Sequence, residues 1–135
     1  MPRGQVYYEV MKLLNPRRRR SNRGNHRLLR VVVEQELGDV LESLEGGRCP
    51  FCGRSFRSYM WARAHVARSR CSFALKSRIE DTLKLYRRIN SCIRRVNGLY
   101  QLRVGDYRTP YFRTKGLLVR YIAETGLITK LKSSF

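Results

Sequence analysis

Acidic residues are scarce in this chain of 135 residues, which has 10 Asp and Glu against 29 Lys and Arg and a formal net charge of +19. No apolar run approaches the roughly 18 residues that a membrane-spanning helix needs. Glu9 and Lys12 also interrupt the stretch where a signal peptide would be apolar. We therefore expect a soluble intracellular protein, in the cytoplasm or in the cytoplasm or nucleoid of a host, without membrane contact.

The side-chain groupings on which most enzymes depend are also missing from the sequence. We find no paired carboxylates, no glycine-rich phosphate loop and no nucleophile beside a base. The length is that of one domain, and the 42% of hydrophobic residues can supply a modest core. A large multidomain enzyme and a wholly disordered chain are therefore excluded, and we expect a protein that is not an enzyme.

Arginine is what the sequence has in excess, with 23 Arg and 6 Lys. Basic residues dominate blocks 1–33 and 46–78, and an acidic block at 34–45 lies between them, where it can screen the basic blocks or pair with them. The planar guanidinium suits phosphate, so we expect nucleic acid as the partner. The alternative is that the arginine content reflects genome composition or the hot habitat of a thermophile.

The spacing of apolar residues predicts a mainly α-helical protein with a small β part, an α+β fold. Helical periodicity extends over 2–14, 27–45 and 77–97. A capping box at Ser77 is expected to open the third helix, and Asn97-Gly98 to end it.

The C-terminal part is predicted to form a hairpin and a final helix. The hairpin covers 99–114 around Gly105-Asp106, and the helix covers 114–125 with Gly126 as its cap. The helix is predicted to bury Leu117, Leu118, Tyr121 and Ile122. A helix-turn-helix is the alternative for this end, but too little chain follows for a recognition helix, so we favour a packing helix.

Two cysteines, a histidine and a third cysteine follow one another at the spacing C-x2-C-x12-H-x5-C: Cys49, Cys52, His65 and Cys71. A tight turn can supply two thiolates, and a helix with its exit can supply two more donors, which together complete a tetrahedral zinc site. The alternatives are isolated core cysteines or a disulfide, which would leave the position of the histidine as a coincidence.

With Gly53 and Phe56 in register, residues 49–71 resemble the ββα zinc-finger family in its CCHC variant. The resemblance implies a short hairpin and a helix around one structural Zn²⁺ held by Cys49, Cys52, His65 and Cys71. Cys71 replaces the usual second histidine, and Ala62 replaces a core leucine, so bulk must come from Trp61, Val66 or neighbouring helices. The finger is therefore expected to dock on the rest of the chain, which resembles no known family.

The same resemblance places Ser58, Trp61 and Ala64 at the positions that read DNA bases, and none of them is a bidentate reader. We expect phosphate contacts with weak sequence readout instead, and DNA in preference to RNA. Five arginines around the finger helix suit such contacts: Arg54, Arg57, Arg63, Arg68 and Arg70. A basic arm at 16–25 adds four more: Arg17, Arg18, Arg19 and Arg20.

The expected organisation is an N-terminal helical part (1–47), the finger (48–72) and a C-terminal part (73–135), forming one compact unit. We expect a small regulatory or packaging protein of an archaeal or viral genome. The alternatives are a protein adaptor that docks through Tyr59, Met60 and Trp61, and an RNA- or ribosome-associated protein. Cys92 is interpreted as a buried free cysteine and His26 as a surface or helix-start residue, rather than as metal ligands.

Overall fold

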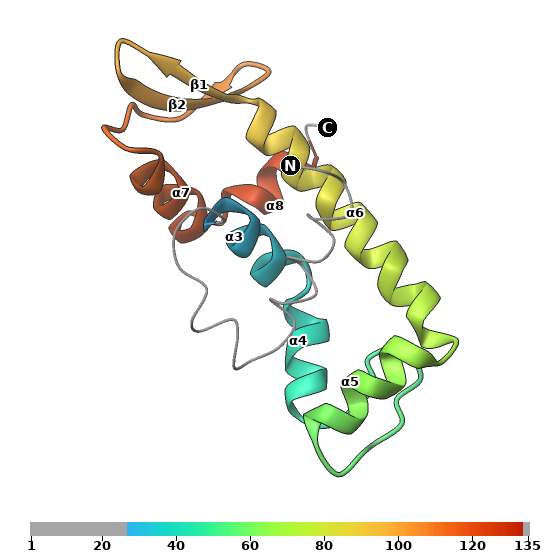
Figure 1. Cartoon of the computed structure of the whole chain (residues 1–135). Coiled ribbons are helices and arrows are strands. Elements are labelled where there is room, and N and C mark those ends of the chain that lie inside the picture. The colour runs from blue at the N-terminus through green and yellow to red at the C-terminus, as the bar shows by residue number, and fades with distance from the viewer. Residues whose placement is uncertain (1–26, 134–135) are drawn as a thin grey trace.

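The computed structural model describes residues 27–133, and the predicted helix over 2–14 and the basic arm at 16–25 lie outside this range. Within it, six helices and a small antiparallel sheet confirm the predicted fold class (Figure 1). The helices are α3 (Arg27–Glu36), α4 (Gly38–Glu45), α5 (Tyr59–Arg68), α6 (Cys71–Ser91), α7 (Lys115–Glu124) and α8 (Leu127–Lys132). The strands are β1 (Ile93–Val96), β2 (Leu99–Val104) and β3 (Tyr107–Arg108).

Helix α6 is the scaffold of the fold and connects α5 at one end to the sheet at the other (Figure 1). Its 21 residues make a rod of about 31 Å. The helical periodicity predicted over 77–97 is confirmed at Ile79, Leu83 and Ile89, which form an apolar stripe and are buried. The predicted capping box at Ser77 is wrong, because the helix already begins at Cys71 and Ser77 lies in its interior.

The helix predicted over 27–45 is interrupted at Leu37 and forms two helices, α3 and α4. The backbone there has φ −113° and ψ 17°, yet the Leu37 N–H still donates to the Val33 carbonyl at 2.8 Å. The chain therefore bends without losing that hydrogen bond. The bend keeps Leu37 fully buried, and Gly38 after it has a low helix propensity.

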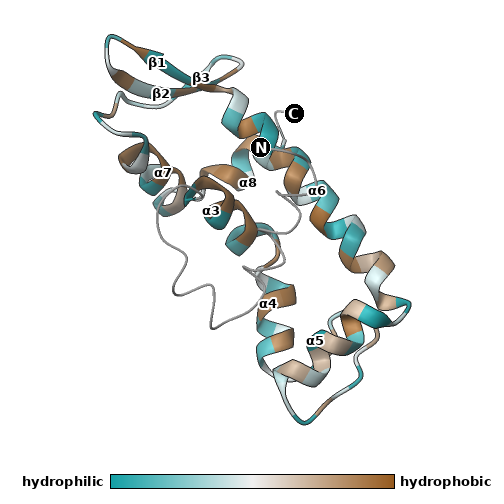
Figure 2. Cartoon of the chain, in the orientation of Figure 1, coloured by the Kyte–Doolittle hydropathy of each residue, from teal (hydrophilic) through white to brown (hydrophobic). Residues whose placement is uncertain are grey.

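The core divides into two clusters along α6, and the apolar side of α3 contributes to both (Figure 2). The cluster that we call the finger-side core contains Leu29, Val33, Leu37, Val40, Leu41, Leu44, Cys49, Ala62, Val66, Leu75, Ile79 and Leu83. The other cluster, the sheet-side core, contains Leu28, Val32, Leu85, Ile89, Leu102, Val104, Leu118, Val119, Ile122, Leu127, Ile128 and Leu131. Between residues 27 and 133 no helix is both long enough and apolar enough to span a bilayer.

The sheet has the order β1-β2-β3 with antiparallel pairing throughout. The hairpin predicted around Gly105-Asp106 is confirmed as the β2–β3 pair. The prediction that Asn97-Gly98 ends a helix is wrong, because these residues form the turn between β1 and β2. Their φ values of 53° and 77° are both positive, as the two-residue turn of a hairpin requires, and Asn-Gly is the preferred pair for it.

The predicted final helix is confirmed as α7, and Gly126 after it adopts φ 63°. Leu118 and Ile122 are buried as predicted, but Leu117 is 46% exposed and Val119 is buried in its place. The short helix α8 follows directly, and its apolar residues join the sheet-side core. This end of the chain thus packs rather than presenting a recognition helix.

Thr114 caps α7, because its side chain accepts a hydrogen bond from the Leu117 N–H at 3.2 Å. Replacing a threonine cap by alanine typically costs about 1 kcal/mol of stability. We expect Thr114→Ala to lower the midpoint of urea unfolding by a corresponding amount and Thr114→Ser to retain it. Equal losses in the two variants would contradict a capping role.

Candidate metal centre

The structure brings the four predicted ligands together in one cluster. One donor atom from each of Cys49, Cys52, His65 and Cys71 lies within 4.8 Å of all the others. The Cys52 Sγ and His65 Nε2 atoms are 3.4 Å apart. In a tetrahedral zinc site, bond lengths of about 2.3 Å to sulfur and 2.0 Å to nitrogen separate the donors by about 3.5 to 3.8 Å. The cluster can therefore hold one metal ion.

A tight turn presents the first two cysteines. The Gly53 N–H donates to the Cys49 carbonyl at 3.0 Å, and the Cys49 N–H donates to the Arg54 carbonyl at 2.9 Å. Gly53 has φ 78°, a conformation that favours glycine. The hairpin implied by the family resemblance is reduced to a single bridge between Arg48 and Ser55, because the chain leaves the turn directly for α5.

The other two ligands come from two different helices. His65 lies within α5, and its ring packs on the Phe56 ring with a centroid distance of 4.9 Å. Cys71 opens α6, and its N–H donates to the Ser69 hydroxyl oxygen at 3.1 Å. A metal ion in this cluster would therefore tie the finger to the scaffold helix.

Neighbouring helices supply the bulk that Ala62 lacks. Ala62 and Val66 are buried in the finger-side core together with Leu41 and Leu44 of α4 and residues of α6. Trp61 does not contribute, because its side chain is 64% exposed. The expectation that the finger docks on the rest of the chain is thus met by packing against α4 and α6.

The two cysteines of the turn have different protonation properties. The backbone N–H of Arg54 hydrogen-bonds to the Cys52 sulfur and is the largest cause that lowers the pKa of Cys52 to about 7. Burial raises the pKa of Cys49. Near neutral pH the Cys52 thiolate forms readily, whereas a metal ion must displace the proton of Cys49.

Metal affinity is therefore expected to rise with pH. Because a bound ion needs the thiolate forms, metal binding should release protons, and the apparent affinity should increase between about pH 6 and pH 8. Cobalt absorption titrations at several pH values measure the affinity, and weakly buffered titrations measure the released protons. An affinity that does not change with pH would contradict thiolate ligation.

The predicted phosphate-binding arginines differ in exposure. Arg54, Arg57, Arg68 and Arg70 are exposed, and none of them forms an ion pair within residues 27–133. Arg63 is half-buried, and its Nε is buried without a hydrogen-bond partner among the described residues. Arg17, Arg18, Arg19 and Arg20 lie outside the described range.

Of the two residues that were not expected to be ligands, Cys92 lies in the described range and is not part of the cluster. Cys92 is half-buried at the end of α6 and packs against the sheet-side core, so the length of α6 separates it from Cys71. His26 lies outside the described range.

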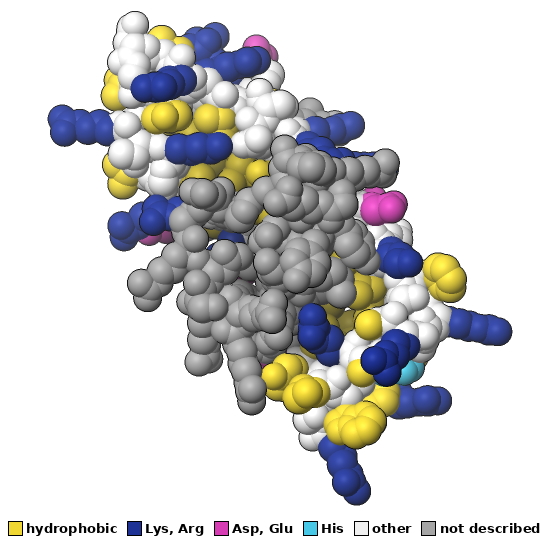
Figure 3. All heavy atoms as spheres, viewed as in Figure 1, with side chains coloured by type: hydrophobic (Ala, Val, Ile, Leu, Met, Phe, Trp, Pro, Cys, Tyr) yellow, Lys and Arg dark blue, Asp and Glu magenta, His cyan; other side chains and the backbone are white. Residues whose placement is uncertain are grey.

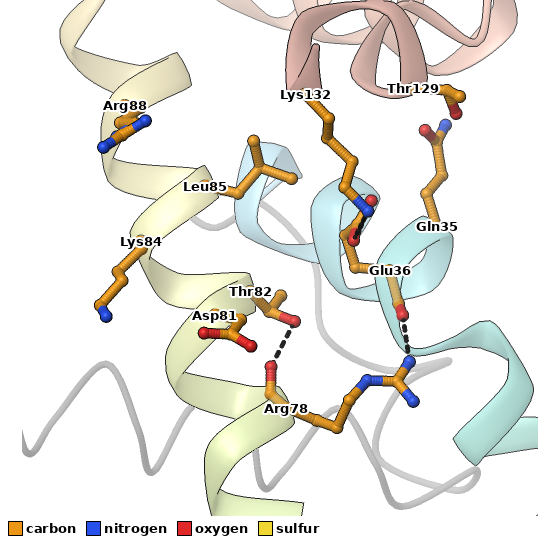
Figure 4. A pocket seen from close by; sticks show the side chains of 10 residues that line it. All are labelled: Gln35, Glu36, Arg78, Asp81, Thr82, Lys84, Leu85, Arg88, Thr129 and Lys132. Carbon is orange, nitrogen blue, oxygen red and sulfur yellow. Dashed lines mark hydrogen bonds and ion pairs between the residues drawn. The ribbon is translucent and has the colours of Figure 1, made fainter. Parts of the chain in front are cut away.

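Residues of the acidic block at 34–45 form ion pairs in and beside a polar hollow between α3, α6 and α8 (Figure 4). Glu36 accepts from Lys132 at 2.8 Å, and its carbonyl accepts from Arg78 at 2.8 Å. Arg78 also binds both carboxylate oxygens of Asp39 and lowers the pKa of that carboxyl. The acidic residues thus pair with basic ones in the middle of the molecule, and Lys and Arg side chains lie at both ends of the face in Figure 3.

No family model, curated protein or solved structure matches this chain, so the resemblance to a zinc finger rests on the four ligands and their surroundings alone.

Proposed function

We propose that this protein binds nucleic acid, DNA in preference to RNA, through arginine–phosphate contacts on a finger that one structural zinc ion holds together. The observation that carries the proposal is the set of exposed arginines around the metal cluster, none of which forms an ion pair with another described residue: Arg54, Arg57, Arg68 and Arg70. No acidic residue occurs between positions 46 and 78, so this surface attracts polyanions.

Zinc is the ion that the donor set favours. Three thiolates and one imidazole are soft or borderline donors, which select zinc over magnesium or calcium. Four protein ligands leave no position for a reactive water molecule, and this supports a structural rather than a catalytic ion. We therefore propose a binding protein that is not an enzyme.

Sequence readout by the finger should be weak. Of the three reading positions, Ser58 and Ala64 are short and half-buried, and Trp61 is exposed but has no bidentate hydrogen-bonding group. Arginine contacts to phosphates position a protein on a duplex without specifying a base sequence. A general role in packaging or regulation follows more readily than recognition of one site.

Two measurements test the proposed function. Elemental analysis should find one zinc per chain, and equilibrium binding at low salt should rank duplex DNA above RNA, with similar affinities for unrelated duplexes. Absence of zinc would contradict the metal assignment. Absence of binding to every nucleic acid at low salt would contradict the proposed function itself.

Exposed apolar side chains around the finger support a second candidate, a protein adaptor. Met60 and Trp61 are each 64% exposed, and Phe73 is 71% exposed. Trp61 also lines a hollow together with Phe56 and Arg57. For this function Trp61→Ala should abolish a protein complex, whereas for phosphate binding it should leave DNA affinity nearly unchanged. The same variant therefore separates the two candidates.

A further inference from the structure

The outer face of the three-stranded sheet is rich in arginine. Successive residues of a strand point to opposite faces, and Leu102 and Val104 face the sheet-side core. Their neighbours therefore lie on the outer face, where the register pairs Arg94 with Gln101 and Arg103 with Arg108. One arginine from each strand thus lies on the same side of the sheet.

Arg103 and Arg108 form a like-charged pair directly across β2 and β3. Such pairs destabilise a sheet unless an opposite charge compensates them. Neither residue, nor Arg94, forms an ion pair within residues 27–133, although Asp106 lies in the adjoining turn. Among residues 27–133, no carboxylate therefore balances the two charges by an ion pair.

Two polar side chains, the buried Gln101 and the exposed Tyr111, hold the Arg103 side chain in place. Its Nε donates to the Gln101 Oε1 at 2.7 Å, and one terminal nitrogen donates to the Tyr111 hydroxyl at 3.4 Å. Gln101 is only 5% exposed and is itself fixed by donating to the Thr109 carbonyl at 2.8 Å. A guanidinium oriented in advance loses less conformational entropy when it binds an anion, and its planar fork matches phosphate oxygens.

We infer that the outer face of the sheet, centred on Arg103 and Arg108, is a second binding surface for the backbone phosphates of nucleic acid. This inference rests on the proposed function and adds a contact far from the metal cluster. The rod of α6, which is about 31 Å long, lies between the finger and the sheet, and its length corresponds to about nine base pairs at 3.4 Å each. A single duplex must exceed that length to contact both surfaces.

The test compares two double variants that lose the same charge. Arg103→Gln with Arg108→Gln removes the proposed contacts, and Arg120→Gln with Lys130→Gln removes two exposed charges from α7 and α8. For a 20-base-pair duplex we expect the sheet variant to bind at least about tenfold more weakly at 100 mM salt, with a salt slope shallower by up to about 1.8. The control variant should stay close to the unmodified protein.

One further variant and two further ligands extend the test. Gln101→Met keeps the net charge but removes the acceptor that orients Arg103, so it should weaken duplex binding while its circular dichroism stays unchanged. Shortening the duplex to six base pairs should remove the difference between the sheet variant and the unmodified protein, because one short duplex cannot contact both surfaces. Vesicles containing anionic lipid should bind less tightly than the long duplex.

Each outcome decides between the proposals. If the unmodified protein binds the long duplex and the sheet and control variants lose equal affinity, the second surface does not exist, although the proposed function stands. If the vesicles bind more tightly than the duplex, the sheet recognises lipid phosphate and the inference is overturned. If the unmodified protein binds no nucleic acid, the proposed function fails and the inference fails with it.

Discussion

Chelation of the metal is expected to release the finger while the sheet-side core stays folded. The finger contributes Cys49, Ala62 and Val66 to the finger-side core, and Phe51, Phe56 and Cys71 pack against it. A segment of this size cannot bury enough apolar surface to fold alone. In isolated zinc-finger peptides the bound ion contributes about 10 to 16 kcal/mol in apparent terms. The sheet-side core contains no residue from 46–70, so we expect it to stay folded without the ion.

Hydrogen exchange with and without chelator measures this difference. Amides of α5 should lose most of their protection, whereas those of α7 and the second half of α6 should retain it. Cys49→Ser should reproduce the effect of chelation, and Cys92→Ser should leave metal binding intact because Cys92 lies outside the cluster. Loss of all helical circular dichroism on chelation would contradict an architecture with two cores.

Neutralising the finger arginines is expected to reduce duplex affinity by orders of magnitude. Each lost phosphate contact makes the slope of log affinity against log salt shallower by up to about 0.9. Replacing Arg57, Arg68 and Arg70 by glutamine should therefore weaken binding about 10² to 10³-fold at 100 mM salt, and equally for every duplex sequence. The three residues are exposed and are not metal ligands, so zinc content should not change.

The matched control replaces three exposed basic residues of the α7 and α8 region, Lys115, Arg120 and Lys130, by glutamine. This control changes the net charge by the same amount as the finger variant, but it should lose much less affinity for the duplex. Replacing the predicted arm residues Arg17 to Arg20 by alanine should weaken all duplexes alike. Equal losses in the finger variant and the control would mean that net charge, and not the finger surface, determines binding.

Short-range patterns allowed much of the fold and the metal cluster to be predicted. The four ligands follow one another within residues 49–71, and the structure brings them together from one turn and the two successive helices α5 and α6. The stripe of Ile79, Leu83 and Ile89 repeats at the helical period, and Gly126 is a strong helix-end signal. These features depend on residues a few positions apart, so tertiary contacts do not override them.

The errors arose where tertiary packing or a second interpretation of the same residues decided the structure. Asn97-Gly98 suits both a helix end and a hairpin turn, and the hairpin forms because Ile93 pairs with Leu102 and Val96 with Leu99. The bend at Leu37 could not be predicted, because it depends on the packing of apolar residues from both α3 and α4 in the finger-side core. The outer arginine face could not be predicted, because it depends on the register between strands.

The salt dependence of duplex binding by the zinc-loaded protein is the most direct test of phosphate recognition by a zinc-held arginine surface. Binding of a 20-base-pair duplex should give a straight line of log affinity against log salt, with a slope steeper than about −5 and equal for two unrelated sequences. Chelation should make the slope shallower by removing the finger contacts. A slope near zero, or binding that is strong for one sequence and absent for the other, would contradict phosphate recognition by a zinc-held arginine surface.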